Sequence, residues 1–180
     1  MALILLGVSG SAACFKAAAL ASTLTKDGHE VQVVMTAAAT EFIGSLQFSC
    51  LTGKTTMVDE FEPLDPSGMD HISLARAADL MLIMPATANT VGVLANGLAP
   101  NLLGSLALAF GTSKPRFFAP AMNPEMWAHP AVQRNVATLL GDGWQQIGPA
   151  SGDTACGETG DGRMVEVDQV ITAISSALQS

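Results

Sequence analysis

The fold of this chain is decided by residues 115–127, which read Pro-Arg-Phe-Phe-Ala-Pro-Ala-Met-Asn-Pro-Glu-Met-Trp. The first part, Pro115 to Ala119, is short, aromatic-rich and bounded by prolines, which predicts a strand that ends at Pro120. In open α/β sheets, ligands bind where the strands end. Pro120 and Pro124 restrict the backbone around Asn123, so we expect this amide either to hold a polar group of a ligand or simply to form a turn.

Three apolar runs precede this strand, at residues 2–8, 30–35 and 80–84. The first and third are continuous rather than alternating, which is typical of strands buried on both faces of a parallel sheet. Helical patterns separate the runs, and Trp144 to Ile147 is predicted to add an edge strand. The order predicts an α/β fold with a single doubly wound parallel sheet flanked by helices, a flavodoxin-like or Rossmann-like three-layer sandwich, with residues 1–180 in one domain.

Composition excludes several classes of partner. The net charge of −8 and the lack of a Lys/Arg cluster argue against nucleic acid and anionic membranes. Because 49% of the residues are hydrophobic and only 13% are charged, we expect a homo-oligomer. The three cysteines lack metal-ligand spacing and fit a reduced, cytoplasmic protein without a metal site. The apolar start lacks a basic leader and is interpreted as a strand, and no apolar run reaches the roughly 20 residues of a membrane helix.

The loop after the first strand, Gly7-Val8-Ser9-Gly10-Ser11, opens a helix predicted from about Ala12 to Lys26. Its backbone N–H groups and the helix dipole could cradle a phosphate, although a plain tight turn is an alternative. The spacing is not Gly-x-Gly-x-x-Gly, so a dinucleotide site is poorly supported. Thr36, at the end of the second strand, is predicted to cap the next helix and to present a second hydroxyl.

Two helices carry further expectations. The helix after the glycine loop is expected to turn Phe15, Ala18, Ala19 and Leu24 toward the core. Asp70 is expected to cap a helix that runs to Ala78, which places His71 in its first turn. The helix dipole there favours the neutral imidazole of a base, although an isolated histidine is more often structural.

The third strand is followed by Pro85-Ala86-Thr87-Ala88-Asn89-Thr90, whose polar side chains alternate with alanines. This arrangement could hydrogen-bond a flat heteroaromatic ring while leaving room for it. Residues 148–164 are rich in glycine and poor in apolar residues, which predicts a flap over the substrate site. Cys156 lies in the middle of the flap, either as a thiol that reacts with the substrate or as an ordinary exposed thiol.

These motifs together resemble the homo-oligomeric flavin-containing cysteine decarboxylases, over nearly the whole chain. The resemblance rests on the glycine and serine loop, His71-Ile72-x-Leu74, the segments at 85–90 and 120–127, and Ala155-Cys156-Gly157-Glu158 followed by Gly160-x-Gly162-Arg163-Met164. It implies that FMN oxidises the substrate thiol to a thioaldehyde, so that CO₂ can leave as an enethiolate forms. The implied reaction converts 4'-phosphopantothenoylcysteine into 4'-phosphopantetheine in coenzyme A biosynthesis.

The resemblance also implies roles for individual residues. His71 would act as the base, Asn123 would hold the substrate carboxylate, and Cys156 would protonate the enethiolate. Met126, Ala155 and Arg163 would complete the substrate site. The FMN site would consist of Ser9, Gly10, Ser11 and Thr36 on the phosphate side and of Thr87, Ala88, Asn89, Thr90 and Ala121 around the rest.

The family leaves alternatives open. Peptidyl-cysteine decarboxylases of modified-peptide pathways share these features but stop at the oxidised product, so Cys156 favours the reductive reaction. Some relatives are non-catalytic regulatory subunits of a phosphatase; the presence of both His71 and Cys156 argues against that function. Thr87 stands where serine is common, which is a mild departure. The family is also expected to form trimers or dodecamers built from trimers.

Overall fold

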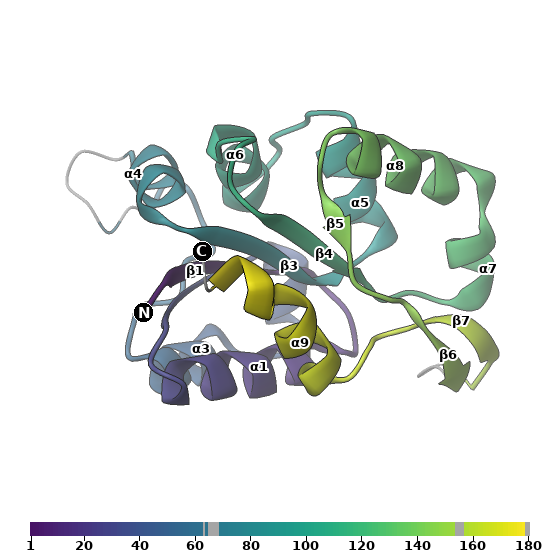
Figure 1. Ribbon diagram of the computed structural model, residues 1–180, viewed down its shortest axis with the longest axis horizontal. Helices are drawn as coiled ribbons and strands as arrows, with labels where there is room; N and C mark the ends of the chain where they lie inside the picture. Colours follow the sequence, from purple (N-terminus) through teal and green to yellow (C-terminus); the bar gives the residue numbers. More distant parts are fainter. Residues whose placement is uncertain (63, 65–68, 154–156, 179–180) are drawn as a thin grey trace.

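The computed structural model describes residues 1–62, 64, 69–153 and 157–178. A five-stranded parallel sheet in the order β2-β1-β3-β4-β5 forms its centre, as Figure 1 shows. The order places β1 and β3 side by side in the middle, and the sheet is the doubly wound arrangement predicted. The strands are β1 (Leu3–Val8), β2 (Glu30–Met35), β3 (Leu80–Ala86), β4 (Arg116–Pro120) and β5 (Gln145–Gln146).

Helices cover both faces of the sheet (Figure 1). On one face Leu20 and Leu24 pack with Phe48 and Ile174 in one apolar cluster, and the other face carries a second cluster that includes Leu106. Strands buried on both sides explain why the apolar runs are continuous rather than alternating. The first face is covered by α1 (Cys14–Lys26), α3 (Ser45–Thr52) and α9 (Val167–Leu178), and the second by α4 (Asp70–Ala77), α5 (Ala88–Ala95), α6 (Leu102–Ala109) and α8 (Pro130–Gly141).

Three shorter features lie near the carboxyl ends of the strands: α2 (Ala37–Thr40), α7 (Pro124–Ala128) and a hairpin of β6 (Ala150–Asp153) and β7 (Thr159–Arg163). The hairpin forms most of the segment predicted to be a flap. It is anchored at its second strand, because the N–H of Met122 donates to the carbonyl of Gly162 at 3.0 Å. The flap therefore packs directly beside the loop that follows β4.

The chain leaves β1 toward β2 on one side, and β3 lies on the other side of β1. This reversal is a topological switch point, at which loops after neighbouring strands part and leave a crevice. The loops that follow β1 and β3 are those predicted to bind the flavin. No helix among the residues that the structure describes is long and apolar enough to cross a membrane.

Two expectations for the helices are wrong. Phe15 is 64% exposed and Ala19 is also exposed, because α1 turns Cys14, Ala17 and Leu20 toward the sheet and so sets the phase of the helix. Asp70 is not the N-cap of α4 but its first residue: its carboxylate accepts a hydrogen bond from the N–H of Leu64 at 2.6 Å. His71 still lies in the first turn of the helix, as predicted.

Candidate functional site

A cavity of about 570 Å³ opens at the switch point. The loops that follow β1, β2 and β3 and the start of α6 form its walls, so segments far apart in the sequence meet there because parallel strands end at one edge of the sheet. Its volume is in the range of small-molecule and cofactor sites. The residues that line it are Ser9, Gly10, Ser11, Thr36, Ala37, Ala38, Thr87, Ala88, Asn89, Thr90, Asn101, Ala121, Met122 and Met126.

Ser9 joins the two loops of the switch point. Its buried hydroxyl donates to the carbonyl of Pro85 at 2.7 Å and accepts from the N–H of Thr87 at 3.0 Å. The N–H of Ser9 also donates to the same carbonyl at 3.3 Å. This side chain therefore fixes the spacing of the two cavity walls rather than offering a spare donor to a ligand.

Three helices point their N-terminal ends at the cavity, each capped by a residue that lines it. Thr36 accepts from the N–H of Ala39 at the start of α2, Thr87 caps α5, and Asn101 caps α6. Helix N-termini carry partial positive charge and bind anions such as phosphate. Among the described residues that line the cavity, none carries a charged side chain, so these dipoles supply the attraction for an anion.

The hydroxyl donors and the apolar side chains of the cavity suit a ligand that has a phosphate at one end and a flat ring at the other. Within the part of the chain that the structure describes, the hydroxyls of Ser11 and Thr36 accept backbone hydrogen bonds but donate to no protein atom. A Cβ on Gly10 would come within 2.8 Å of the backbone of Ala38, so only glycine lets the loop lie this close to α2. Methionine and alanine side chains also line the cavity, which suits a flat apolar ring. The cavity thus has the chemistry expected for FMN.

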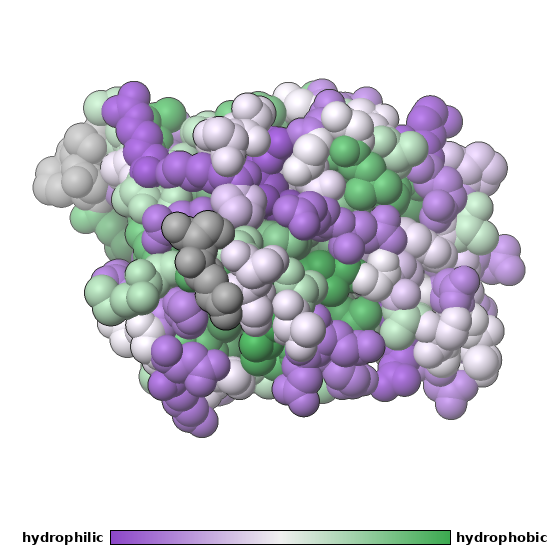
Figure 2. Space-filling model, viewed as in Figure 1, coloured by the Kyte–Doolittle hydropathy of each residue, from purple (hydrophilic) through white to green (hydrophobic). Residues whose placement is uncertain are grey.

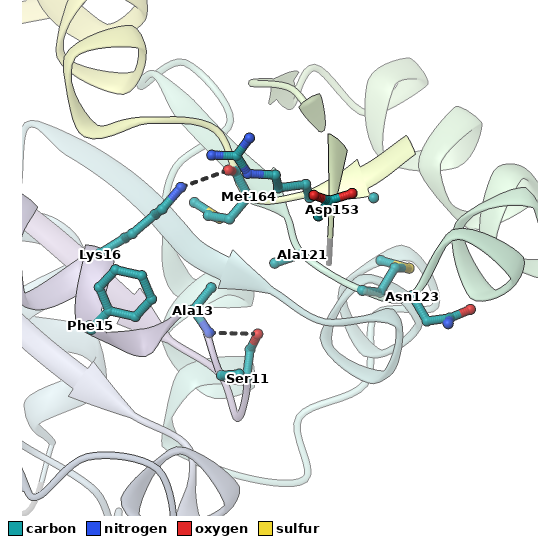
Figure 3. A pocket seen from close by; sticks show the side chains of 12 residues that line it. Ser11, Ala13, Phe15, Lys16, Ala121, Asn123, Asp153 and Met164 are labelled. Atoms are coloured by element: carbon teal, nitrogen blue, oxygen red, sulfur yellow. Dashed lines mark hydrogen bonds between the residues drawn. The ribbon is translucent and has the colours of Figure 1, made fainter. Parts of the chain in front are cut away.

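A second cavity of about 440 Å³ lies beside the first, between the start of α1 and β7. The two share Ser11, Ala121 and Met122. In Figure 3, Phe15 and Lys16 of α1 border one side of this cavity, and Asn123 lies at the far side with its side chain directed away from them. This cavity adjoins the first one and reaches the flap, so it has room for a second small molecule beside a ligand in the first.

Lys16 connects α1 to the base of the flap. Its ammonium donates to the carbonyls of Met164 and Val165 at 2.9 and 3.3 Å and to the carboxylate of Glu166 at 2.9 Å. Figure 3 draws the bond to Met164. Three acceptors match the three donors of an ammonium group. Glu166 also accepts from Arg163 at 2.6 Å, and these cations, Lys16 first, hold the pKa of the Glu166 carboxyl below its usual range. All three hydrogen bonds of Lys16 therefore hold the base of the flap. Arg163 is partly exposed at the rim of the second cavity.

Asn123 caps α7 and presents its amide donors to the flap. Its Oδ1 accepts from the N–H of Glu125 at 2.8 Å and from that of Met126 at 3.4 Å. These two bonds orient the amide, so Nδ2 faces outward and donates to the carboxylate of Glu158. An amide oriented in this way has N–H donors that can bind a carboxylate.

The predicted site residues fall into three groups. All nine residues predicted to bind FMN line the larger cavity, together with Met126. Asn123 and Arg163 line the second cavity. His71 lines neither cavity, and Ala155 and Cys156 lie outside the described residues.

Sequence reasoning missed several lining residues. Asn101 could have been found, because an asparagine that opens a helix after a proline is a common N-cap. Phe15 and Lys16 were missed because the phase of α1 depends on its packing against the sheet. Cys14 lies close to the cavities, but burial raises the pKa of its thiol and its Sγ contacts the carbonyl of Ser9 at 3.3 Å. Cys14 is therefore a core residue rather than a reactive thiol.

The profile of the sequence family described as Flavoprotein matches residues 2–179. The chain belongs to the flavoprotein family. This confirms the family resemblance and agrees with a cavity suited to FMN. A probable phosphopantothenoylcysteine decarboxylase of Streptococcus mutans is 44% identical over 97% of this flavoprotein and 98% of its own length. The bifunctional coenzyme A biosynthesis protein CoaBC of Bacillus subtilis is 43% identical over 93% of this chain, which spans 41% of that relative.

Solved structures agree with the fold of this flavoprotein. A PPC decarboxylase variant in complex with pantothenoylaminoethenethiol superposes with a TM-score of 0.88 at 32% identity, over 99% of both chains. The FMN-dependent cysteine decarboxylase SpaF gives a TM-score of 0.84 at 31% identity, over 99% of this chain and 98% of that one. These matches confirm the predicted fold, and the relatives carry the activity and the cofactor that the sequence led us to expect.

Proposed function

We propose that this flavoprotein is an FMN-dependent carboxy-lyase that converts 4'-phosphopantothenoylcysteine into 4'-phosphopantetheine, with residues 1–180 as one decarboxylase domain. The observation that carries this proposal is the uncharged cavity at the switch point, where three helix N-termini converge beside an oriented amide. The relatives named as phosphopantothenoylcysteine decarboxylases support this substrate.

The cavity residues would hold FMN by its two chemically different ends. Ser9, Gly10, Ser11 and Thr36 surround the part best suited to the phosphate, since the N-terminus of α2 and the hydroxyls of Ser11 and Thr36 lie there. Thr87 to Thr90 and Ala121 border the part left for the ring. Bound FMN would supply reversible two-electron chemistry: oxidation of the substrate thiol to a thiocarbonyl provides a sink for the electrons that CO₂ leaves behind, and return of the two electrons afterwards gives the saturated product.

The chain's own residues would orient the substrate and move its protons. Nδ2 of Asn123 would donate to the substrate carboxylate, and Arg163 at the rim would meet the substrate phosphate. Met126 and Ala155 would enclose the reacting cysteine. Cys156 would return a proton to the enethiolate after CO₂ has left.

His71 would act as the base from a neighbouring copy of the chain. It lies at the start of α4 and lines neither of the two cavities. A catalytic base must come within hydrogen-bond reach of the proton it removes. We therefore propose that assembly of identical chains brings one copy's His71 to another copy's flavin cavity.

A homo-oligomer, as a trimer or as a dodecamer of trimers, also fits the surface. Hydrophobic areas reach the surface between hydrophilic ones on the face shown in Figure 2. Large apolar side chains are exposed outside the cavities as well, among them Phe42, Leu46 and Leu98 at 57%, 73% and 54%. Isolated exposed side chains are ordinary, and contact between identical chains would bury some of these large apolar ones. Light scattering after size exclusion would measure the mass of the oligomer and so the number of chains in it. We propose that the protein is cytoplasmic.

The main alternative is a decarboxylase of a peptide's C-terminal cysteine, and it is supported by the likeness to SpaF. The decisive experiment is mass spectrometry of the products from 4'-phosphopantothenoylcysteine and from a cysteine-terminated peptide. The proposal requires loss of CO₂ alone, with the saturated amide-thiol as product, from the first substrate. Loss of CO₂ plus two hydrogens from the peptide alone would establish the alternative. No turnover of either by flavin-loaded protein would favour the third possibility, a non-catalytic regulator of a phosphatase.

Cys156→Ser separates the two halves of the reaction. The variant should still release CO₂ but accumulate the unsaturated thiol, two hydrogens lighter than the normal product. Complete conversion to the saturated product by this variant would rule out Cys156 as the proton donor.

A further inference from the structure

The flap carries three acidic side chains in its described part, and they are used differently. Asp153 accepts a hydrogen bond from the hydroxyl of Thr159 at 2.6 Å, and Asp161 accepts one from the hydroxyl of Ser151. Both bonds join β6 to β7 and stay within the hairpin. Glu158 instead reaches out of the hairpin to Nδ2 of Asn123. Of the three acidic side chains in the described part of the flap, Glu158 is therefore the one that accepts a hydrogen bond from Asn123, the amide proposed to bind the substrate carboxylate.

The hairpin does not depend on this contact to lie where it does. The backbone bond between Met122 and Gly162 already holds β7 against the loop after β4. A Cβ on Gly162 would come within 2.5 Å of the carbonyl oxygen of Met122, and a Cβ on Gly160 within 3.0 Å of Pro124. This close backbone packing, together with the anchor at Lys16, fixes the hairpin. The position of Glu158 therefore has a consequence for ligand binding rather than for the attachment of the flap.

We infer that Glu158 occupies, in the substrate-free protein, the place of the substrate carboxylate on Asn123, and that the two compete for it. This inference rests on the proposed function, in which Asn123 receives the substrate carboxylate. The amide is oriented by its bonds to α7, so it cannot turn to avoid Glu158. Two carboxylates at one amide repel each other, so a substrate must displace Glu158.

The competition makes Glu158 a residue that determines specificity. A ligand with a carboxylate replaces the bond that Glu158 loses, whereas a ligand without one leaves the amide to Glu158. Substrate and product differ by this carboxylate. Once CO₂ has left, Glu158 regains Asn123, which favours release of the product over its retention.

Binding to the flavin-loaded protein tests this inference. The probe is 4'-phosphopantothenoyl-L-serine, whose hydroxyl replaces the thiol and prevents oxidation, and its partner is the same amide of ethanolamine, which lacks the carboxylate. Glu158→Gln removes the competing charge, and the matched control Asp161→Asn removes one charge from the same hairpin without touching Asn123. In calorimetric titrations, Glu158→Gln should bind the serine probe roughly fivefold more tightly than wild type, the size of a population shift that removes one weak competitor.

The controls separate the contact from general charge. Asp161→Asn should change the affinity for the serine probe by less than about twofold, since exposed charges are screened by salt. Neither variant should alter binding of the ethanolamine probe. Equal tightening by both variants, or equal tightening for both probes, would overturn the inference.

Asn123→Ala distinguishes this inference from the proposed function. If the serine probe binds less tightly to Asn123→Ala than to wild type while Glu158→Gln has no effect, Asn123 receives the carboxylate and Glu158 does not compete for it. If Asn123→Ala binds the probe as tightly as wild type, the carboxylate site itself is misplaced, and the inference falls with it.

Discussion

The hydroxyl of Ser9 accepts a hydrogen bond from the N–H of Thr87 at 3.0 Å and so ties the end of β1 to the end of β3. These residues are 78 positions apart in the sequence. The bond spans the switch point of the sheet, where the cavity for the flavin opens. The width of this cavity therefore depends on the buried side chain of Ser9 together with the backbone hydrogen bond from Ser9 to Pro85.

Ser9→Ala should lower both stability and flavin affinity. The variant leaves the N–H of Thr87 and the carbonyl of Pro85 without the hydroxyl, and a buried group that loses its partner costs about 1–3 kcal/mol. Urea denaturation and titration of flavin fluorescence measure the two effects. Ser175→Ala is the control, because it removes a hydroxyl whose hydrogen bond, to the carbonyl of Ile171, lies within its own helix. Equal stability losses in the two variants would contradict a special role for Ser9.

Gly10→Ala should weaken FMN binding more than it weakens folding. The added Cβ would lie 2.8 Å from the backbone of Ala38, so the loop must move away from α2 and out of the position that faces the phosphate. Overpacking of this kind costs about 1–3 kcal/mol, which we expect to appear in the flavin dissociation constant. Gly44→Ala is the control, since a Cβ there meets nothing within 4 Å. Unchanged flavin affinity in Gly10→Ala would place the phosphate elsewhere.

Lys16→Met should loosen the flap. The substitution keeps the length of the side chain but removes three hydrogen bonds to residues 164–166. We expect faster proteolytic cleavage within the hairpin and a loss of about 1–2 kcal/mol in the free energy of unfolding. Lys26→Met, in the exposed last turn of the same helix, controls for the loss of charge. A hairpin as resistant to protease as that of wild type would show that Lys16 does not hold it.

The contact between Lys16 and Glu166 also predicts a dependence on pH. The hydrogen bond and charge of Lys16, followed by the charge of Arg163, lower the pKa of Glu166 below its ordinary value of 4.5. A carboxyl group with a lowered pKa in the folded state stabilises the protein fully above the pKa of the unfolded state, and this contribution disappears as pH falls through the folded-state pKa.

Glu166→Gln is therefore expected to be less stable than wild type near neutral pH, with a difference that shrinks in acid below the ordinary carboxyl range. Denaturation midpoints of the two proteins between pH 7 and pH 3 measure this difference. A gap that stays constant over the whole range would exclude the charge of Glu166 as its cause.

His71→Asn should retain flavin and lose turnover. His71 lines neither cavity, so its replacement leaves the flavin site intact, whereas loss of a general base costs about 10²–10⁴-fold in rate. Flavin absorbance and CO₂ release measure the two properties on one preparation. Mixing His71→Asn with Asn123→Ala tests assembly, because co-assembled chains would restore activity if one copy supplies the base and another the amide. Normal turnover by His71→Asn would remove this residue from the mechanism.

Much of the site could be predicted from the sequence because it lies where strands end. The apolar runs that form β1 and β3 are followed at once by the hydroxyl residues Ser9 and Thr87, and Asn123 comes shortly after β4, so short local stretches of sequence contain the ligand-facing positions. All nine residues expected around FMN line one cavity for this reason. The carboxyl ends of parallel strands lie at the same edge of the sheet, so residues that follow different strands come together in one site.

Tertiary structure alone decided how the second cavity is built. The sequence of α1 allowed Phe15 to face the core, but packing of Cys14, Ala17 and Leu20 against the sheet turned it outward. Contacts between Lys16 and residues 164–166, and between Asn123 and Glu158, join segments that no local pattern relates. The sequence determined which chemistry the strand ends carry, because that chemistry follows from neighbouring residues; which side chains meet across the site depends on helix phase and on the path of the flap, which only the packed chain fixes.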